Sequence, residues 1–135
     1  MSAAENKALA KAVWDAFAEG DGRQFVAAMA DDFVWRHMFP TDWRHAYEGK
    51  QCVVEEFFPA TRAQYASRYK SAATRIIADD DHVVIECRNE VTMKSGAPFI
   101  GNRCYVIEME NGKMRELREY FDTALTNRTL VAPPS

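Results

Sequence analysis

The stretch Asn111–Leu125, NGKMRELREYFDTAL, decides the fold that we expect for this chain. Its Asn-Gly pair stands between two runs of strand-like alternation and is the dipeptide most typical of a two-residue type I′ turn. The turn predicts a hairpin that opens with Glu110 opposite Lys113. Pairing outward from there places Cys104 opposite Glu119.

The last strand of this hairpin has two unlike faces. Leu117, Glu119 and Phe121 share a face that is apolar apart from one carboxylate. Helices are expected to cover this face, so Glu119 is our candidate for a carboxylate turned into the interior. The opposite face is predicted to meet solvent or a second subunit, and it carries Glu116, Arg118, Tyr120 and Asp122.

The strand expected at residues 82–93 admits two registers against this hairpin. A two-residue turn after it leaves Arg88 on the outside of the sheet. One additional residue, absorbed by a bulge, brings Glu86 and Arg88 alongside Glu119. The alternation of the strand is compatible with both arrangements.

Helical patterns come before the strands. Ser2 and Glu5 have the spacing of a capping box, and apolar residues then recur every four positions until Gly20. The other predicted elements are a short helix capped by Asp21 and carrying Phe25 and Met29, a strand at 33–37, a loop at 38–49, a helix from about Lys50 that Pro59 kinks or ends, a strand at 71–78 and a closing helical turn at 123–130.

Helices followed by a meander of long strands indicate an α+β architecture. We expect a strongly curved antiparallel sheet that wraps around the N-terminal helices and forms a cone with an interior pocket. A chain of 135 residues without a repeat or a linker-like tract is predicted to form one domain, over residues 1–135.

The composition limits the partners of this domain. Seventeen basic and twenty acidic residues give a net charge of −3 with no basic run, so we expect no nucleic-acid partner. We also expect no membrane span, and three cysteines without CxxC spacing indicate reduced thiols in the cytoplasm. The sequence has neither metal-ligand spacing nor a glycine-rich phosphate loop, so no metal and no cofactor are predicted.

Three side chains are candidates for acid–base chemistry. Burial disfavours the ionised form of a carboxyl group, so Glu119 is expected to exchange a proton with a substrate; its alternative role is a structural ion pair with an arginine. His37 carries an imidazole suited to proton transfer near neutral pH, or is a structural histidine. Asp122 is the alternative acid, and it is also well placed to cap the closing helix.

Aromatic residues make up 12% of the chain and either fill the core or line a ligand pocket. Trp35 is the leading candidate for the lining because its strand borders the irregular segment 38–49. Pockets for small molecules are mostly apolar with a few converging polar groups. The candidate substrate-binding residues are Trp14, Trp35, Phe57, Phe58, Glu86, Asn102, Cys104 and Phe121.

The helical stretch Gly20–Trp35, GDGRQFVAAMADDFVW, and the hairpin stretch Asn111–Leu125 together resemble the SnoaL-like branch of the nuclear transport factor 2-like superfamily. The resemblance extends from about Glu5 to Leu130. It implies a cone-shaped α+β fold with a pocket, and we expect a homodimer, as is common in that superfamily. Its members include polyketide cyclases, ketosteroid isomerase, limonene epoxide hydrolase and binding modules without known chemistry.

Limonene epoxide hydrolase offers a match for individual residues. Its final strand ends in a similar Arg-Asp-Tyr-Phe-Asp, whose first acid is catalytic and matches Glu119. Its pocket Tyr-x-Asn falls on Trp35 and His37, so the side chains that hold its water are absent here. Its Arg-x-Asp falls on Glu86 and Arg88 with the order of charge reversed, and this match implies that both residues point inward.

Two other members of the superfamily offer less for residue-level transfer. Ketosteroid isomerase has a phenol that falls near Val13 and an oxyanion-hole acid that falls near Cys104, and neither residue here has the chemistry required. The SnoaL-like cyclases use a pocket acid that corresponds to either Glu119 or Asp122.

We therefore expect a cofactor-independent acid–base enzyme of the cyclase, isomerase or hydrolase type, acting on a small apolar oxygenated molecule. In this hypothesis Glu119 exchanges the proton and Arg88 holds the charge. His37 or Asn102 orients the oxygen, while Trp35 packs on the apolar body. The alternative is a non-catalytic ligand-binding or dimerisation module on the same fold.

Overall fold

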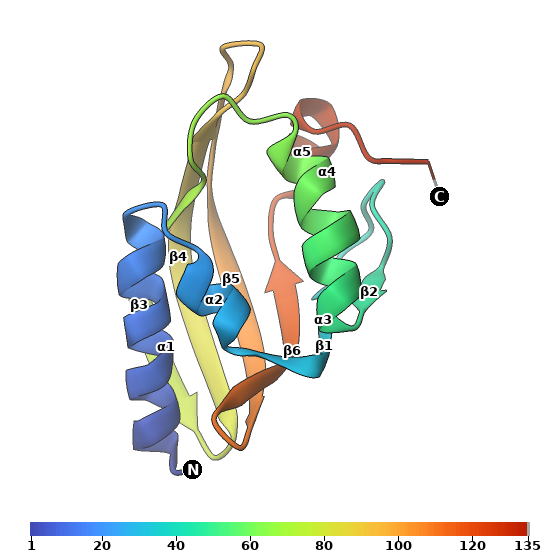
Figure 1. The fold of residues 1–135 in the computed structure, drawn as a ribbon. Helices are drawn as coiled ribbons and strands as arrows, with labels where there is room; N and C mark the ends of the chain where they lie inside the picture. Colours follow the sequence, from blue (N-terminus) through green and yellow to red (C-terminus); the bar gives the residue numbers. More distant parts are fainter. Residues whose placement is uncertain (135) are drawn as a thin grey trace.

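The computed structural model describes residues 1–134 (Figure 1). Two helices and a strand pair come first, followed by a second helical segment, four long strands and a last short helix. In chain order the elements are α1 (Ala3–Ala18), α2 (Arg23–Ala27), β1 (Met29–His37), β2 (Ala46–Glu48), α3 (Lys50–Cys52), η1 (Val53–Phe57), α4 (Phe58–Arg62), β3 (Lys70–Asp79), β4 (His82–Thr92), β5 (Pro98–Glu110), β6 (Lys113–Tyr120) and α5 (Thr123–Thr129).

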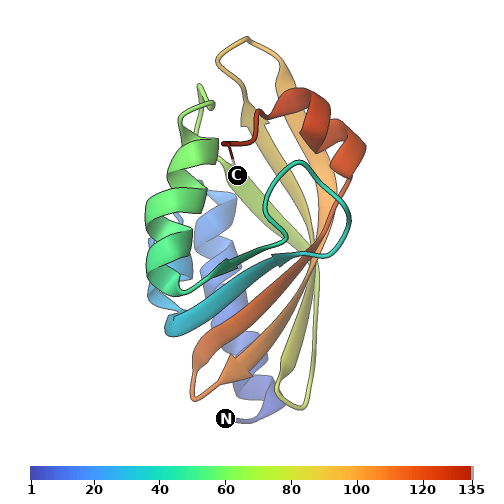
Figure 2. The same ribbon diagram turned by 90° about the vertical axis from the view of Figure 1, so that its right-hand side faces the viewer.

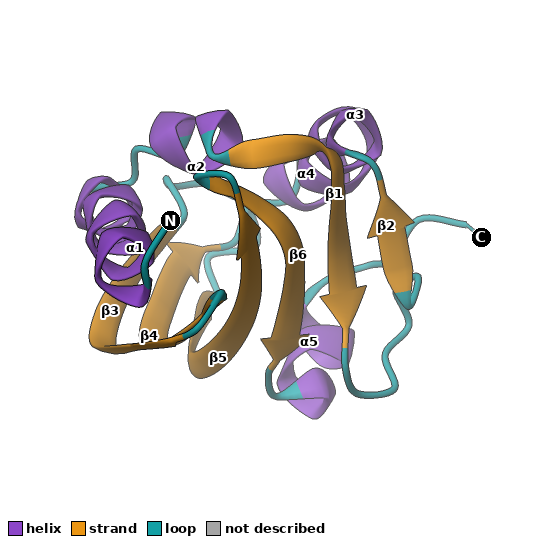
Figure 3. Ribbon diagram, turned by 90° about the horizontal axis from the view of Figure 1, so that it is seen from below, coloured by secondary structure: helices purple, strands orange, loops and turns teal. Residues whose placement is uncertain are grey.

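The six strands form one sheet in the order β2-β1-β6-β5-β4-β3. The sheet is strongly curved and does not close, as the view along the strands shows (Figure 3). Neighbouring strands are antiparallel except for β1 and β6, which run parallel. The α+β fold with a curved sheet is confirmed, and the parallel pair is a feature that the strand order in the sequence did not predict.

The helices α1, α2 and the α3–η1–α4 segment all lie on the same face of the sheet (Figures 1 and 2). The first of them packs against β3 and β4. Its predicted capping box is confirmed: the Ser2 hydroxyl accepts a hydrogen bond from the Glu5 amide, and the Glu5 carboxylate accepts one from the Ser2 amide. None of the helices within residues 1–134 is long and apolar enough to cross a membrane.

The other helical predictions hold in outline and differ at their ends. Gly22, not Asp21, is the N-cap of α2, although the Asp21 carboxylate accepts a hydrogen bond from the Arg23 amide. Met29 begins β1 and does not belong to the helix. Pro59 lies in the first turn of α4, directly after the wide π-helical turn η1, and the helical segment continues past it to Arg62.

The predicted loop at residues 38–49 contains a short strand. In this strand, β2, Tyr47 pairs with Trp35 of β1. The amide of His37 donates a hydrogen bond to the carbonyl of His45, which closes the loop against β1. With only three residues, β2 is too short for alternation to show in the sequence.

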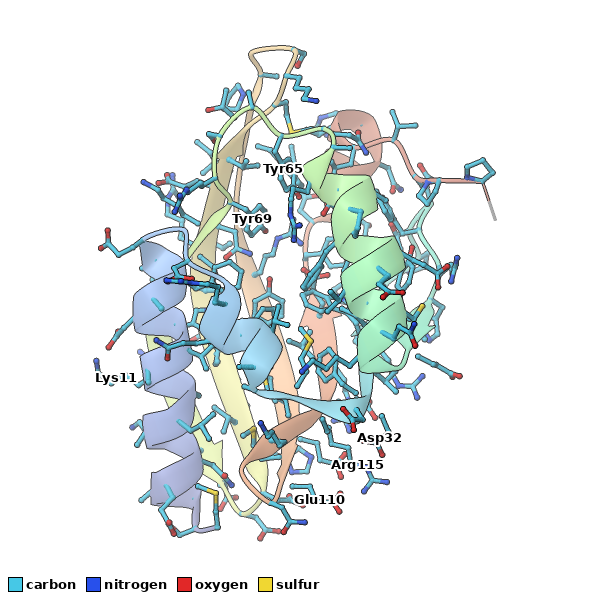
Figure 4. The ribbon with its side chains drawn as sticks, viewed as in Figure 1. Lys11, Asp32, Tyr65, Tyr69, Glu110 and Arg115 are labelled. Carbon is cyan, nitrogen blue, oxygen red and sulfur yellow. The ribbon has the colours of Figure 1, made fainter. Side chains whose placement is uncertain are left out.

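The turn between β5 and β6 is the predicted type I′ turn. Asn111 and Gly112 have φ angles of 51° and 75°, and Glu110 pairs with Lys113. The pairing register shifts after the next pair, Met109 with Met114, because β6 contains one extra residue there. This residue is Arg115, labelled in Figure 4.

This bulge changes the residue that faces the candidate acid. Tyr105, not Cys104, pairs with Glu119, so the predicted Cys104 register is wrong by one position. A shift of one residue exchanges the two faces of a strand. Tyr105 therefore lies on the covered face of β5, and Cys104 lies on the outer face.

The loop between β4 and β5 and the bulge in β6 together decide which face of the sheet carries Arg88. The loop is one residue longer than a two-residue turn, because the Met93 amide donates to the carbonyl of Ala97 over 2.9 Å. Cys87 consequently pairs with Arg103 on the covered face.

Glu86 pairs with Cys104, as in the predicted register with one additional residue, but the bulge in β6 turns Cys104 outward. Glu86 and Arg88 are therefore exposed on the outer face, and the inward position expected from that register and from the epoxide hydrolase match is wrong.

Candidate active site

An open cavity of about 1070 Å³ lies between the covered face of the sheet and the helices α2 and α4. Strands β1, β5 and β6 each contribute side chains to it, as does the segment between α4 and β3. Aromatic side chains are the largest group in its lining, and edge-to-face contacts join some of the neighbouring rings. Six of the aromatic residues around it are Trp35, Trp43, Phe57, Phe58, Tyr105 and Phe121.

Glu119 is the buried acid of this cavity. Only 2% of the residue is exposed, and it belongs to the covered face of β6, as its alternation with Leu117 predicts. Its Oε1 accepts a hydrogen bond from Trp35 Nε1 over 3.2 Å, and its Oε2 accepts one from Arg103 Nη1. A carboxylate with two such donors satisfies the requirement that buried charges be paired.

His37 lies beside this carboxylate because β1 runs parallel to β6 and pairs His37 with Glu119. The ring is buried, and its Nδ1 lies 2.7 Å from the backbone carbonyl of Arg44. A carbonyl oxygen only accepts, so Nδ1 carries a hydrogen. The other nitrogen, Nε2, lies 3.5 Å from Glu119 Oε1.

Arg103 supplies the positive charge that the sequence led us to expect from Arg88. Its guanidinium lies over the Phe121 ring, 5.0 Å from the centroid, and 5.4 Å from that of Phe99. Burial alone would lower the pKa of this guanidinium, but the neighbouring negative charge of Glu119 holds it well above its usual range. Arg103 therefore remains a permanent cation at the base of the cavity.

Two tyrosines near this ion pair were absent from the predicted site. Tyr105 faces Glu119 from β5, and Tyr69 lies on the segment that crosses from α4 to β3 (Figure 4). Burial, with the nearby charge of Glu119, raises the pKa of Tyr105 well above its ordinary value, and burial likewise raises that of Tyr69. Both phenols are therefore neutral hydroxyls at physiological pH.

The structure brings together about half of the predicted site residues. Glu119 and His37 line the cavity together with the predicted aromatic residues Trp35, Phe57, Phe58 and Phe121. Trp14 lies in the core behind them, where its indole N–H donates to Ser71 Oγ over 3.0 Å.

The other predicted residues lie away from the cavity. Glu86 and Arg88 are exposed on the outer face, where they pair with Cys104 and Asn102 of β5. Asp122 is the N-cap of α5, and its carboxylate accepts a hydrogen bond from the Leu125 amide over 3.0 Å. The prediction that Asp122 caps the closing helix is therefore confirmed.

Two of the missed residues, Arg103 and Tyr105, share a pattern on β5 that could have indicated them. Phe99, Tyr105 and Ile107 are the apolar members of one alternating set, and Arg103 belongs to the same set.

Within residues 1–134 no group of three or more histidine, cysteine or carboxylate side chains is placed to hold a metal ion.

Comparison with solved structures shows the same fold over nearly the whole chain. A nuclear transport factor 2-like protein of unknown function from Burkholderia pseudomallei is 25% identical, with a TM-score of 0.78 over 98% of this chain and 100% of its own. TerC, co-crystallised with polyporic acid, is 21% identical, with a TM-score of 0.77 over 93% of this chain and 97% of its own.

A protein from Jannaschia sp. CCS1 described as a SnoaL-like polyketide cyclase is 15% identical, with a TM-score of 0.75 over 97% of this chain and 94% of its own. No curated protein matches the chain. The family model of the SnoaL-like domain matches residues 10–117. The chain therefore belongs to the SnoaL-like family of the nuclear transport factor 2-like superfamily.

Proposed function

We propose that this protein is a cofactor-independent acid–base enzyme that acts on a small, largely apolar, oxygenated organic molecule. The observation that carries the proposal is the buried pair of Glu119 and His37 in a cavity with aromatic walls. TerC, which has the same fold, was co-crystallised with polyporic acid, and this agrees with an organic ligand for the present chain.

The proposed chemistry is a proton transfer that the pair can reverse. A proton held between Glu119 Oε1 and His37 Nε2 is placed on the substrate, or one is taken from a carbon next to a carbonyl group. In the second case the C–H bond breaks, its electron pair passes into the enolate, and the proton goes to the pair. Cyclisation, isomerisation and hydrolysis of the cyclase, isomerase and epoxide-hydrolase types all require a proton transfer of this kind.

Hydrogen–deuterium exchange tests the proposal without a known substrate. A panel of ketones is incubated with the protein in D₂O, and mass spectrometry measures deuterium uptake at the carbon next to the carbonyl. We expect exchange with at least one ketone, and a loss of about 10²- to 10⁴-fold in its rate for Glu119→Gln. The control is Glu116→Gln on the outer face of the same strand, which should exchange at the wild-type rate.

Full exchange activity in a folded Glu119→Gln variant would contradict the proposed role of Glu119. The proposal would also be contradicted if no ketone of the panel gained deuterium faster than it does in buffer alone.

A non-catalytic binding module is the second candidate function. The observation that favours it is the ion pair with Arg103, which together with Trp35 provides hydrogen-bond donors to both Glu119 carboxylate oxygens. This hypothesis predicts that ketones and epoxides bind and are recovered unchanged by mass spectrometry. A dimerisation role would use the outer face, where Ile77 and Ile100 are exposed, and it predicts sedimentation as a dimer at micromolar concentration.

A further inference from the structure

A chain of buried polar groups leads from the core to the cavity and fixes the orientation of Asn89. Trp14 Nε1 donates to Ser71 Oγ over 3.0 Å, and an indole N–H is only a donor. The Ser71 hydroxyl must therefore direct its own hydrogen elsewhere, and it donates to Asn89 Oδ1 over 2.6 Å. With its oxygen held by Ser71, the Asn89 amide turns its NH₂ group in the opposite direction.

The NH₂ group of Asn89 holds two tyrosines at once. Asn89 Nδ2 donates to Tyr69 Oη over 2.7 Å and to Tyr105 Oη over 2.9 Å. Both of its hydrogens are used, and both phenolic oxygens act as acceptors. The two hydroxyl groups consequently lie within two hydrogen-bond lengths of each other, on residues that come from different parts of the chain.

Each of these hydroxyls still has its own hydrogen to donate. Within residues 1–134, neither Tyr69 nor Tyr105 donates a hydrogen bond to another group, and both residues line the cavity. The raised pKa values of the two phenols keep these hydrogens in place across the neutral range. The cavity thus contains two neighbouring O–H donors without acceptors.

One member of this donor pair, Tyr105, lies next to Glu119, the acid of the proposed proton transfer. Tyr105 pairs with Glu119 across β5 and β6, so the two side chains project side by side from the covered face. A group bound to the donors would hold its neighbouring atoms close to the carboxylate. Two hydrogen bonds match the two lone pairs of a carbonyl oxygen, and they strengthen when that oxygen becomes an enolate.

We propose that Tyr69 and Tyr105, held by Asn89, form a two-donor site for the carbonyl oxygen of a ketone substrate. This inference rests on the proposed function and adds the class of substrate, an enolisable ketone whose carbonyl oxygen binds the two tyrosines. The C–H bond next to that carbonyl then faces Glu119 and His37.

The test uses 1-tetralone labelled with ¹³C at its carbonyl, and tetralin as a probe of similar shape without the oxygen. Calorimetry gives the affinities, and infrared spectroscopy gives the carbonyl stretching frequency of the bound ketone. We expect 1-tetralone to bind more tightly than tetralin, with a lowered carbonyl frequency. Tyr69→Phe and Tyr105→Phe should each weaken 1-tetralone binding about 3- to 10-fold and reverse part of the frequency shift.

Tyr65→Phe is the matched control. Tyr65 also lines the cavity and stacks on Tyr69, with 5.5 Å between ring centroids, but its hydroxyl makes no hydrogen bond with Asn89. This variant should keep both the affinity and the frequency of the wild type. Unchanged binding of tetralin to all three variants shows that the cavity is intact.

Three results would overturn the two-donor site: 1-tetralone that binds no more tightly than tetralin, a bound carbonyl without a shifted frequency, or equal effects of Tyr65→Phe and Tyr105→Phe. Failure of the proposed function is separable from these results. Glu119→Gln should keep the carbonyl shift of 1-tetralone, so loss of the shift counts against the tyrosines and loss of deuterium exchange concerns the acid.

Discussion

The two faces of β6 carry the same kind of ion pair in opposite surroundings. On the covered face, Glu119 and Arg103 have side chains that are 3% and 12% exposed. On the outer face, the Glu116 side chain is 20% exposed and accepts hydrogen bonds from Arg36 and Arg118 over 3.1 and 3.0 Å. The comparison shows that contact with water, and not the chemistry of the pair, separates a candidate site from an ordinary surface.

Energetic consequences follow from this difference in exposure. Water screens the outer pair, and exposed ion pairs contribute about 0–1 kcal/mol to stability. The inner pair has lost its hydration, so each charge depends on the other and on the groups around it. The following three predictions test this contrast, in order of decreasing effect.

Removal of the arginine from each pair should give the largest difference. Arg103→Met leaves the Glu119 carboxylate buried without its counter-charge, and we expect the free energy of unfolding to fall by about 3–5 kcal/mol. Arg118→Met, the outer control, should lower it by less than about 1 kcal/mol. Urea denaturation at neutral pH measures both.

A double variant tests whether the loss of stability in Arg103→Met comes from the unpaired, buried charge of Glu119. The double variant Arg103→Met with Glu119→Gln carries no buried charge and should be more stable than Arg103→Met alone. Equal losses for Arg103→Met and Arg118→Met would show that burial does not distinguish the two faces.

Loss of a hydroxyl from β3 should have an intermediate effect. Ser71→Ala leaves Trp14 Nε1 and Asn89 Oδ1 without their partner in the core, at an expected cost of about 1–3 kcal/mol. The control on the same strand is Thr74→Ala, whose exposed hydroxyl donates to the Glu86 carbonyl, and its effect should stay within about 0.5 kcal/mol. A Thr74→Ala variant less stable than Ser71→Ala in thermal unfolding would contradict the buried network.

The smallest effect is expected at Asp122, the carboxylate that follows β6. Asp122→Ala removes the cap of α5 and should lower the free energy of unfolding by about 1 kcal/mol, whereas Asp122→Asn should keep the cap and most of the stability. Denaturant unfolding of the two variants gives the comparison. If Asp122→Ala instead abolished deuterium exchange at unchanged stability, Asp122 and not Glu119 would be the acid.

The inward orientation of Glu119 could be predicted because it depends only on local alternation. Leu117, Glu119 and Phe121 follow the bulge, so the extra residue does not alter which of them share a face. The capping box at Ser2 and the Asn-Gly turn were predictable for the same reason, since each depends on a few adjacent residues.

The partners of Glu119 could not be predicted in the same way. The bulge at Arg115 turns Arg103 inward, and a loop one residue longer than the shortest turn places Arg88 on the outer face. The contact with His37 depends on a parallel pairing between the first and last strands, which leaves no periodic pattern in the sequence. Tyr69 belongs to neither a helix nor a strand, so no alternation reports its direction.

The position of β6 within the sheet has a consequence for how the molecule is made. The last strand in sequence lies between β1 and β5, and Trp35 and Glu119, whose side chains meet there, are 84 residues apart. During synthesis β1 with β2, and β3 with β4 and β5, can pair before β6 exists, but no strand joins the two groups. The sheet becomes continuous, and the buried acid meets its histidine, only in a late step that closes a very long loop.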